Sequence, residues 1–235
     1  MTSEKRTARI AGAIYLVVVI SGMFSLLYVP SQLIDWNDPG ITFNQISNNS
    51  QLFRLGIASG FICYVSFLIL PLVLFRLLHF VNRDMAYLMV IFAIISVPIS
   101  LANMQHHFHI LTLIDNTDLV ASIGAVAAQD RVMSSLIAFN QGNTIAQIFW
   151  GLWLFPFGYL VFNSDILPKV LGAFLMLGSI GYVLDFFGQV LFSNYYEMVI
   201  SSYLTIPASI GELGICAWML IMGAKNKSRV LAAQA

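Results

Sequence analysis

The sequence predicts an all-helical polytopic membrane protein, a bundle of six transmembrane helices. Apolar residues make up 59% of the 235 residues and charged residues only 9%, against roughly 25% charged in a typical soluble domain. The apolar residues also fall in long runs, and about 20 helical residues are enough to cross the hydrocarbon layer of a bilayer. We therefore expect residues 1–235 to form a single integral membrane domain.

Six runs are apolar and long enough to be spans. They are Ile10–Val29, Leu52–Phe80, Met85–Leu113, Asn143–Phe162, Val170–Phe192 and Leu204–Gly223. The first follows Lys5, Arg6 and Arg9, as in a signal peptide, but its apolar part is too long and no cleavage motif follows, so we expect a retained helix. The second and third exceed the minimum length, which favours tilt.

The segment Leu119–Phe139 lies in the third loop of the chain, an outer loop, and is too apolar for an ordinary loop. Asp130 and Arg131 near its middle argue against a further span. We interpret the segment as an interfacial helix, with its apolar side in the membrane surface.

Lys and Arg residues flank the predicted spans very unevenly. One side has Lys5, Arg6, Arg9, Arg76, Arg83, Lys169, Lys225, Lys227 and Arg229, and the other has Arg54 and Arg131. Because positive residues collect on the cytoplasmic side, this pattern predicts a multi-pass protein of the plasma (inner) membrane with both termini cytoplasmic. Outer loops then fall at about residues 30–51, 114–142 and 193–203, and they are longer than the cytoplasmic turns, which favours ligand contact outside.

Several classes of function are excluded or unsupported. Eleven basic and eleven acidic residues give a formal net charge of zero, which argues against nucleic acid as a partner. Cys63 and Cys216 both lie inside apolar runs, so no disulfide framework is indicated. No phosphate-binding loop, serine nucleophile elbow or dinucleotide motif occurs, and we expect no cofactor.

Polar residues inside the predicted spans are the candidate functional residues. An ionisable group at membrane depth costs roughly 2.5 to 3.5 kcal/mol on insertion scales and needs a partner or a hydrated cavity. A helical rise of about 1.5 Å per residue places Asp185, Glu212 and Gln147 about 20 to 24 Å from the cytoplasmic ends of their spans. Arg54 and Asn103 come out higher, at about 29 to 33 Å. The sequence therefore predicts a polar layer in the outer half of the bundle.

This layer has a structural and a functional interpretation. Gly178, Gly181 and Gly188 share a helical face with Asp185, and small residues on one face favour close helix packing. In the structural interpretation Arg54 neutralises Asp185 or Glu212 as a buried ion pair.

In the functional interpretation, the second to sixth helices form a pocket open to the outside. Glu212 or Asp185 binds a cation or exchanges a proton there, and Arg54 holds an anionic group. Gln147 and Asn103 supply hydrogen bonds. These five residues are the predicted ligand-binding set.

His106 and His109 are separated by three positions, a spacing that lets two imidazole rings reach one metal ion on a helix face. With a carboxylate they could complete a zinc site that activates water. No H-E-x-x-H motif supports this, and a histidine-rich helix end is also typical of the membrane interface. We expect His107 to face away from His109 and to be exposed.

Several short stretches are distinctive: Arg9–Leu16, Phe53–Gly56, Val81–Arg83, Gly158–Phe162, Leu167–Gly172, Gly181–Tyr182 and Gly211–Leu213. They resemble a family of uncharacterised prokaryotic multi-pass membrane proteins, a domain of unknown function. The resemblance implies a helix bundle of about six spans in a prokaryotic membrane. It matches Arg54 and Glu212 to recurring family positions and implies no activity, and the run Gln105–His109 is not part of it.

The function predicted from sequence is the binding, sensing or movement of a small molecule, an ion or a lipid within the bilayer. One alternative is a metal-dependent membrane-embedded hydrolase that uses His106, His109 and a carboxylate. The other is a structural or partner-binding membrane protein with a closed core. Whether the protein is an enzyme stays open, and a homodimer is compatible with so few spans.

Overall fold

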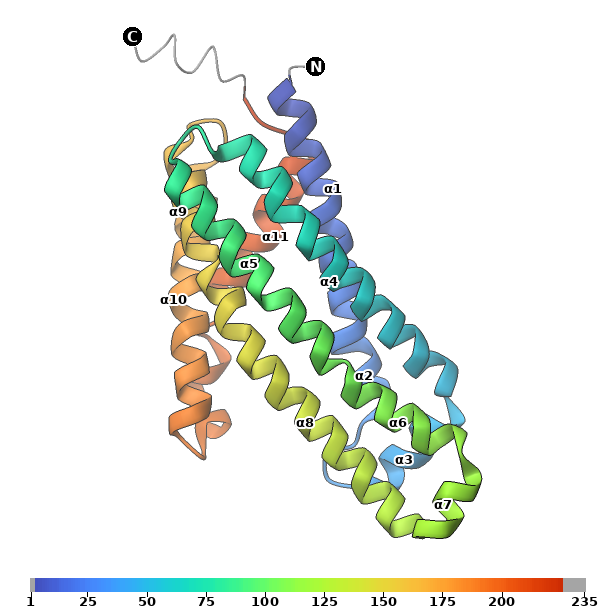
Figure 1. The fold of residues 1–235 in the computed structure, drawn as a ribbon. Coiled ribbons are helices and arrows are strands. Elements are labelled where there is room, and N and C mark those ends of the chain that lie inside the picture. The colour runs from blue at the N-terminus through green and yellow to red at the C-terminus, as the bar shows by residue number, and fades with distance from the viewer. Residues whose placement is uncertain (1–2, 226–235) are drawn as a thin grey trace, which may run out of the picture. The chain divides into compact units, whose positions relative to one another are not determined.

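The computed structural model describes residues 3–225, except for the side chain of Tyr196. Lys227 and Arg229 of the predicted cytoplasmic cluster lie outside the described residues. Within them every regular element is a helix (Figure 1). Six of the helical segments are long and apolar enough to cross a membrane: Ser3–Leu33, Ser50–Leu78, Arg83–Asp115, Ala125–Asn163, Lys169–Leu191 and Val199–Ile221. The predicted fold class is confirmed.

The first half of the chain forms three of these segments and one short helix. The elements are α1 (Ser3–Met23), the π-helix η1 (Phe24–Tyr28), α2 (Val29–Leu33), α3 (Pro39–Asn48), α4 (Ser50–Leu78), α5 (Arg83–Asn103) and α6 (Gln105–Asp115). The side chain of Asp38 caps α3 by accepting a hydrogen bond from the backbone N–H of Ile41 at 2.9 Å, as expected of an N-cap aspartate. Asn82 caps α5 in the same way, through the N–H of Met85 at 3.0 Å.

The second half contains the remaining three segments. Its elements are α7 (Thr117–Ile123), α8 (Ala125–Leu152), α9 (Leu154–Asn163), α10 (Lys169–Leu191), the short 3-10 helices η2 (Tyr195–Glu197) and η3 (Val199–Ser202), and α11 (Ile206–Ile221). The loop between α9 and α10 contains Asp165, which forms an ion pair with Lys169 at 2.8 Å.

The helix that contains the predicted fourth span is longer than the sequence indicated. We expected a span over Asn143–Phe162 and an interfacial segment over Leu119–Phe139, but α8 is continuous from Ala125. Gly124, with φ of 85°, separates it from the short α7. Asp130 and Arg131 are both exposed on α8, so their charges do not interrupt the helix. The apolar pattern before residue 143 belongs to the same helix as the pattern after it.

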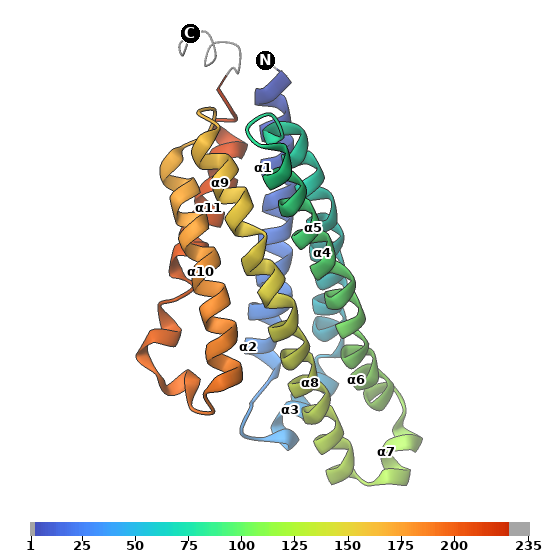
Figure 2. The same cartoon turned by 60° about the vertical axis from the view of Figure 1, so that its left-hand side comes forward.

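The chain divides into two compact units. Unit 1 comprises Met1–Val17, Ser66–Val97 and Ile145–Ala235, and unit 2 comprises Val18–Val65 and Pro98–Thr144. In unit 1, α10 and α11 lie side by side in both views (Figure 2).

Glycines bring the helices of unit 1 into close contact. A Cβ atom on Gly178 of α10 would overlap the backbone of Ala208 on α11, and one on Gly12 of α1 would overlap the backbone of Leu220. This agrees with the expected packing face of small residues.

Candidate functional site

The predicted ligand-binding residues belong to different units and have different surroundings. Asp185, Glu212 and Gln147 lie in unit 1, and Arg54 and Asn103 lie in unit 2. Asp185 and Glu212 are the carboxyl groups of unit 1 that lie inside the spans expected from the sequence.

Asp185 is held by neutral hydrogen-bond donors. Its Oδ2 atom accepts hydrogen bonds from Nε2 of Gln147 and from Nε2 of Gln189, the latter at 2.7 Å, and its Oδ1 accepts one from the hydroxyl of Tyr195 at 2.6 Å. The side chain is buried, with 7% of the residue exposed. The sequence predicted Gln147 and Asp185 at the same depth in the membrane. Their hydrogen bond is a direct contact between α8 and α10.

Local packing explains how Tyr195 reaches this carboxylate. The chain leaves α10 after Leu191 and folds back through η2, and the ring of Tyr195 packs on Gly188 one turn from Asp185. Any side chain at position 188 would overlap that ring. Tyr195 is itself 3% exposed, so the loop after α10 forms part of the carboxylate environment.

Glu212 on α11 is surrounded differently. Its Oε1 atom accepts a hydrogen bond of 2.8 Å from the hydroxyl of Tyr15 on α1. No further partner is found for Glu212 among the described residues, and neither Glu212 nor Asp185 forms an ion pair with a described Lys or Arg. Glu212 is half-buried, between the exposed Leu213 and the buried Gly211.

Aromatic side chains fix Tyr15 beside Glu212. The Tyr15 ring is 2% exposed and its centroid lies 6.2 Å from that of Trp153. Trp153 in turn stacks on Phe157 at 5.2 Å and meets the edge of Phe67 at 5.0 Å. The hydroxyl of Tyr15 is therefore held on a rigid apolar support, as aromatic packing of this kind provides.

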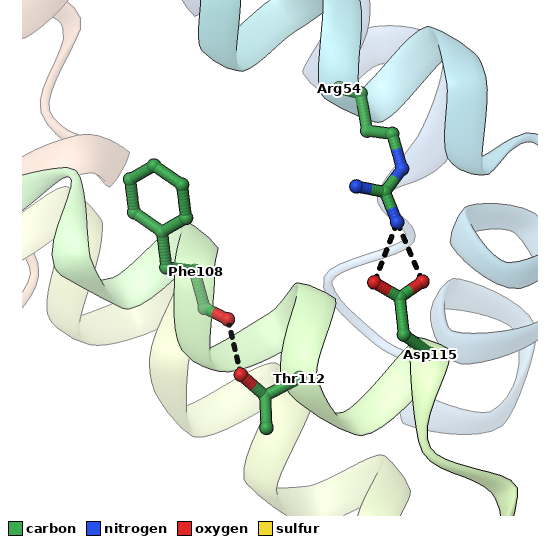
Figure 3. A network of polar contacts seen from close by, with 4 residues as sticks. All are labelled: Arg54, Phe108, Thr112 and Asp115. Atoms are coloured by element: carbon green, nitrogen blue, oxygen red, sulfur yellow. Dashed lines mark hydrogen bonds and ion pairs between the residues drawn. The ribbon is translucent and has the colours of Figure 1, made fainter.

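Arg54 has a different partner from the one expected. Its guanidinium group donates from Nη2 to both carboxylate oxygens of Asp115 at 2.6 Å, as Figure 3 shows. Both side chains are largely exposed, at 42% and 51%. Arg54 is thus paired with a carboxylate of its own unit. Asp115 ends the helix α6, so a carboxylate near the end of the third predicted span pairs with the arginine near the start of the second.

Asn103 serves the packing of unit 2. Its Nδ2 donates to the backbone carbonyl of Phe139 at 2.8 Å and to Oδ1 of Asn143 at 3.1 Å. Gly142 lies so close to Asn103 that a Cβ atom there would overlap its amide. The side chain therefore joins α5 to α8.

The histidines differ from one another in burial. The rings of His106 and His109 are 6.1 Å apart in an edge-to-face arrangement, and His109 is exposed. Within residues 3–225 no group of three or more His, Cys, Asp or Glu side chains is arranged to hold a metal ion. The expectation that His107 is exposed is wrong, because its ring is buried between Phe53 and Phe139.

Sequence reasoning missed Tyr15, Gln189, Tyr195 and Asp115. Gln189 lies four residues after Asp185, so helical spacing alone could have placed it beside the carboxylate. The two tyrosines carry no charge and therefore gave no comparable signal.

Comparison with known proteins places the chain in a family. Residues 10–223 match a family described as a domain of unknown function, DUF4386. The chain belongs to this family, as the resemblance noted in the sequence implied. A relative from Archaeoglobus fulgidus, described as an uncharacterized protein, is 34% identical over 90 residues, which is 38% of this chain and 51% of that protein. The chain thus matches about half of the relative's length. No solved structure matches the chain.

Proposed function

We propose that the protein binds or senses a small molecule or an ion, or moves it across the membrane. In each case a proton is exchanged, and Glu212 is the group that binds and releases this proton. The observation that carries the proposal is the single neutral partner of this carboxyl group, the hydroxyl of Tyr15 at 2.8 Å. A charged group at membrane depth needs a partner. A carboxylate can also lose its charge there by binding a proton.

The difference between the two carboxyl groups supports Glu212 over Asp185. An ionised carboxyl group offers about four acceptor positions. Asp185 uses three of them on Gln147, Gln189 and Tyr195, whereas Glu212 uses one. The remaining acceptor positions of Glu212 are available to a proton or to a solute.

A proton suits this site better than a metal ion. Hard cations in proteins are coordinated by about six to eight oxygen ligands, whereas the contact that Glu212 makes among the described residues is one hydrogen bond from a tyrosine hydroxyl. The proposal therefore assigns Glu212 to proton exchange, with Tyr15 as the residue that positions it. Arg54 and Asn103 are not part of the proposed exchanging group, because each already has partners within unit 2.

We also propose an orientation for the site. The excess of Lys and Arg on one side favours cytoplasmic termini in a plasma membrane. In that orientation Glu212 and Asp185 both lie in the outer half of the bilayer, and the proposed route of the proton opens to the outside. Proton exchange would then occur with the outer aqueous phase.

Infrared difference spectroscopy tests the proposal. Spectra of purified protein in lipid nanodiscs are recorded between acidic and alkaline buffers, and the stretching band of a protonated carboxyl group is followed. We expect a titrating band that disappears in Glu212→Gln and is kept in Asp185→Asn. In Tyr15→Phe the same band should remain but shift in frequency, because the carboxyl group has lost its hydrogen bond.

Two results would overturn the proposal. One is a titrating intramembrane band that survives in Glu212→Gln, and the other is the absence of such a band in the wild-type protein. The wild-type measurement decides even if a variant fails to fold.

A further inference from the structure

The turn between α4 and α5 brings two exposed arginines to one end of a helical hairpin. Arg76 lies in the last turn of α4 and Arg83 begins α5, and residues 79–82 join the two helices. Neither arginine forms an ion pair with a carboxylate among the described residues. The neighbouring acid, Asp84, lies about 100° around the helix from Arg83. The hairpin end therefore presents positive charge that no ion pair neutralises.

The guanidinium group of Arg83 is held by Tyr87, one turn further along α5. Its Nε and Nη2 atoms donate to the Tyr87 hydroxyl at 3.3 and 3.1 Å, and its central carbon lies 5.6 Å from the centroid of the tyrosine ring. An arginine has five N–H donors, and these contacts use two of them. Because Tyr87 is neutral, the positive charge and the other donors of Arg83 are available to an anion.

Tyr87 is fixed by side chains from the other helix of the hairpin. Its ring lies 5.1 Å from that of Phe75 on α4, and Phe75 stacks on His79 at 5.5 Å. The Nδ1 atom of His79 donates to the carbonyl of Phe75 at 3.0 Å, since a carbonyl oxygen only accepts. The row of His79, Phe75 and Tyr87 thus holds Arg83 before any ligand arrives, which lowers the entropy cost of binding.

Exposed aliphatic side chains lie about one to two turns further into the two spans. They are Leu72 on α4, and Leu88 and Ile91 on α5. Both helices belong to segments that are long and apolar enough to cross a membrane. A molecule that fits this surface has an anionic head at the helix ends and hydrocarbon chains beside the aliphatic residues.

Charge complementarity selects the class of lipid. In phosphatidylcholine an ammonium group neutralises the phosphate, whereas phosphatidylglycerol keeps the net negative charge of its phosphodiester. The planar guanidinium group of arginine suits phosphate oxygens, and basic clusters at the ends of membrane helices recognise anionic headgroups. The two arginines of the hairpin therefore favour a lipid with a net negative charge.

We propose that this end of the α4–α5 hairpin is a binding site for an anionic phospholipid. Arg83 binds the phosphodiester, Arg76 adds a second positive charge, and Tyr87 positions the guanidinium group of Arg83. The lipid chains lie along the exposed aliphatic residues. The proposal is independent of proton exchange at Glu212, and it requires only that the hairpin end lies at a membrane surface.

Native mass spectrometry tests the proposal on the full chain. The protein is released from detergent micelles that contain phosphatidylglycerol and phosphatidylcholine in equal amounts, and the retained lipids are identified by their mass. We expect one phosphatidylglycerol to be retained in preference to phosphatidylcholine by at least about 5-fold, as one arginine near an anionic headgroup provides.

Three variants at exposed positions distinguish a site from a general attraction between basic residues and anionic lipid. Arg83→Gln should remove most of the preference. Arg6→Gln, which removes the same charge from α1, should change the preference by less than about 2-fold. Tyr87→Phe keeps every charge and should lower the preference at least about 2-fold, because Arg83 loses the hydroxyl that holds it.

The proposal fails on any of three results. One is equal retention of the two lipids by the wild-type protein, and another is an equal loss of preference in Arg83→Gln and Arg6→Gln. The third is an unchanged preference in Tyr87→Phe. The wild-type comparison needs no variant and decides on its own if a variant does not fold.

Discussion

At the scale of single residues, the two intramembrane carboxyl groups differ in how completely they are satisfied. Asp185 accepts three hydrogen bonds and is buried. Glu212 accepts one and is half-buried. Because the net value of a hydrogen bond is small but an unsatisfied buried partner is costly, removing the charge at these two positions should have unequal effects on stability.

The pair of Tyr15 and Glu212 gives a prediction of its own. Tyr15→Phe removes the described donor to Glu212 and should lower the free energy of unfolding in detergent by about 1 to 2 kcal/mol. In a double-mutant cycle with Glu212→Met, whose side chain cannot accept this hydrogen bond, the two losses should not add, because the residues are in direct contact. Chemical denaturation of the four proteins measures the coupling, and strictly additive losses would show that the hydrogen bond is absent.

Arg54 should contribute little to stability. Its ion pair with Asp115 is exposed on both sides, and such pairs are typically worth less than about 1 kcal/mol. Arg54→Gln should therefore change the free energy of unfolding by less than about 1 kcal/mol, and the change should shrink at high salt. A loss of several kcal/mol, insensitive to salt, would instead indicate a buried structural pair. Thermal unfolding at two salt concentrations distinguishes these cases.

The sequence identified part of this residue-level organisation. Depth counting placed Gln147 level with Asp185, and the two side chains are hydrogen-bonded. The same counting placed Arg54 near a helix end, and the sequence interpretation paired it with an intramembrane acid. Its partner in the structure is Asp115, which ends α6. Tyr15 was not predictable as the partner of Glu212. In the sequence, a tyrosine on an apolar helix cannot be distinguished from a packing residue, because the contact between α1 and α11 is not known.

At the scale of helices, glycine positions decide how closely segments approach. The Cβ of an alanine at Gly178 would meet the backbone of Ala208, whereas one at Gly22 would meet only the side-chain sulfur of Cys63. Both glycines lie inside helices, where alanine is intrinsically favoured by roughly 1 kcal/mol.

These two glycines form a matched pair for a test of packing. Gly178→Ala should lower the free energy of unfolding by about 1 to 3 kcal/mol, since overpacking outweighs the helix preference. Gly22→Ala should be neutral or stabilising by up to about 1 kcal/mol, because a side-chain atom can move aside. Thermal unfolding of both variants shows whether Gly178→Ala is less stable than Gly22→Ala. Equal stability of the two proteins would contradict close packing of α10 on α11.

Helix boundaries were predictable where apolar runs end in charged or turn-forming residues, as at Arg83 and Lys169, which begin α5 and α10. They were not predictable before residue 143, because exposed Asp130 and Arg131 on α8 resemble a loop in a linear count of charges. The π-turn at Phe24–Tyr28 also had no sequence signal beyond Pro30.

At the scale of the whole molecule, the distribution of positive residues predicts the orientation in the membrane. Asn37 lies on the predicted outer side and Asn163 on the predicted cytoplasmic side, and both side chains are exposed. In intact cells a membrane-impermeant maleimide should label Asn37→Cys almost completely and Asn163→Cys only after lysis. The native Cys63 and Cys216 are buried, so the wild-type protein is the control. Labelling of Asn163→Cys in intact cells would reverse the proposed orientation.

The measurement that tests the central claim most directly is the unfolding free energy of Asp185→Asn beside that of Glu212→Gln in the same detergent. We predict a loss of about 1.5 to 3 kcal/mol for Asp185→Asn, because the substitution removes the charge that strengthens three hydrogen bonds to a buried group. Glu212→Gln should lose less than about 1 kcal/mol, because its amide oxygen can still accept the hydrogen bond from Tyr15. Strong and equal destabilisation by both substitutions would contradict the account and make the two carboxyl groups parts of a closed structural core.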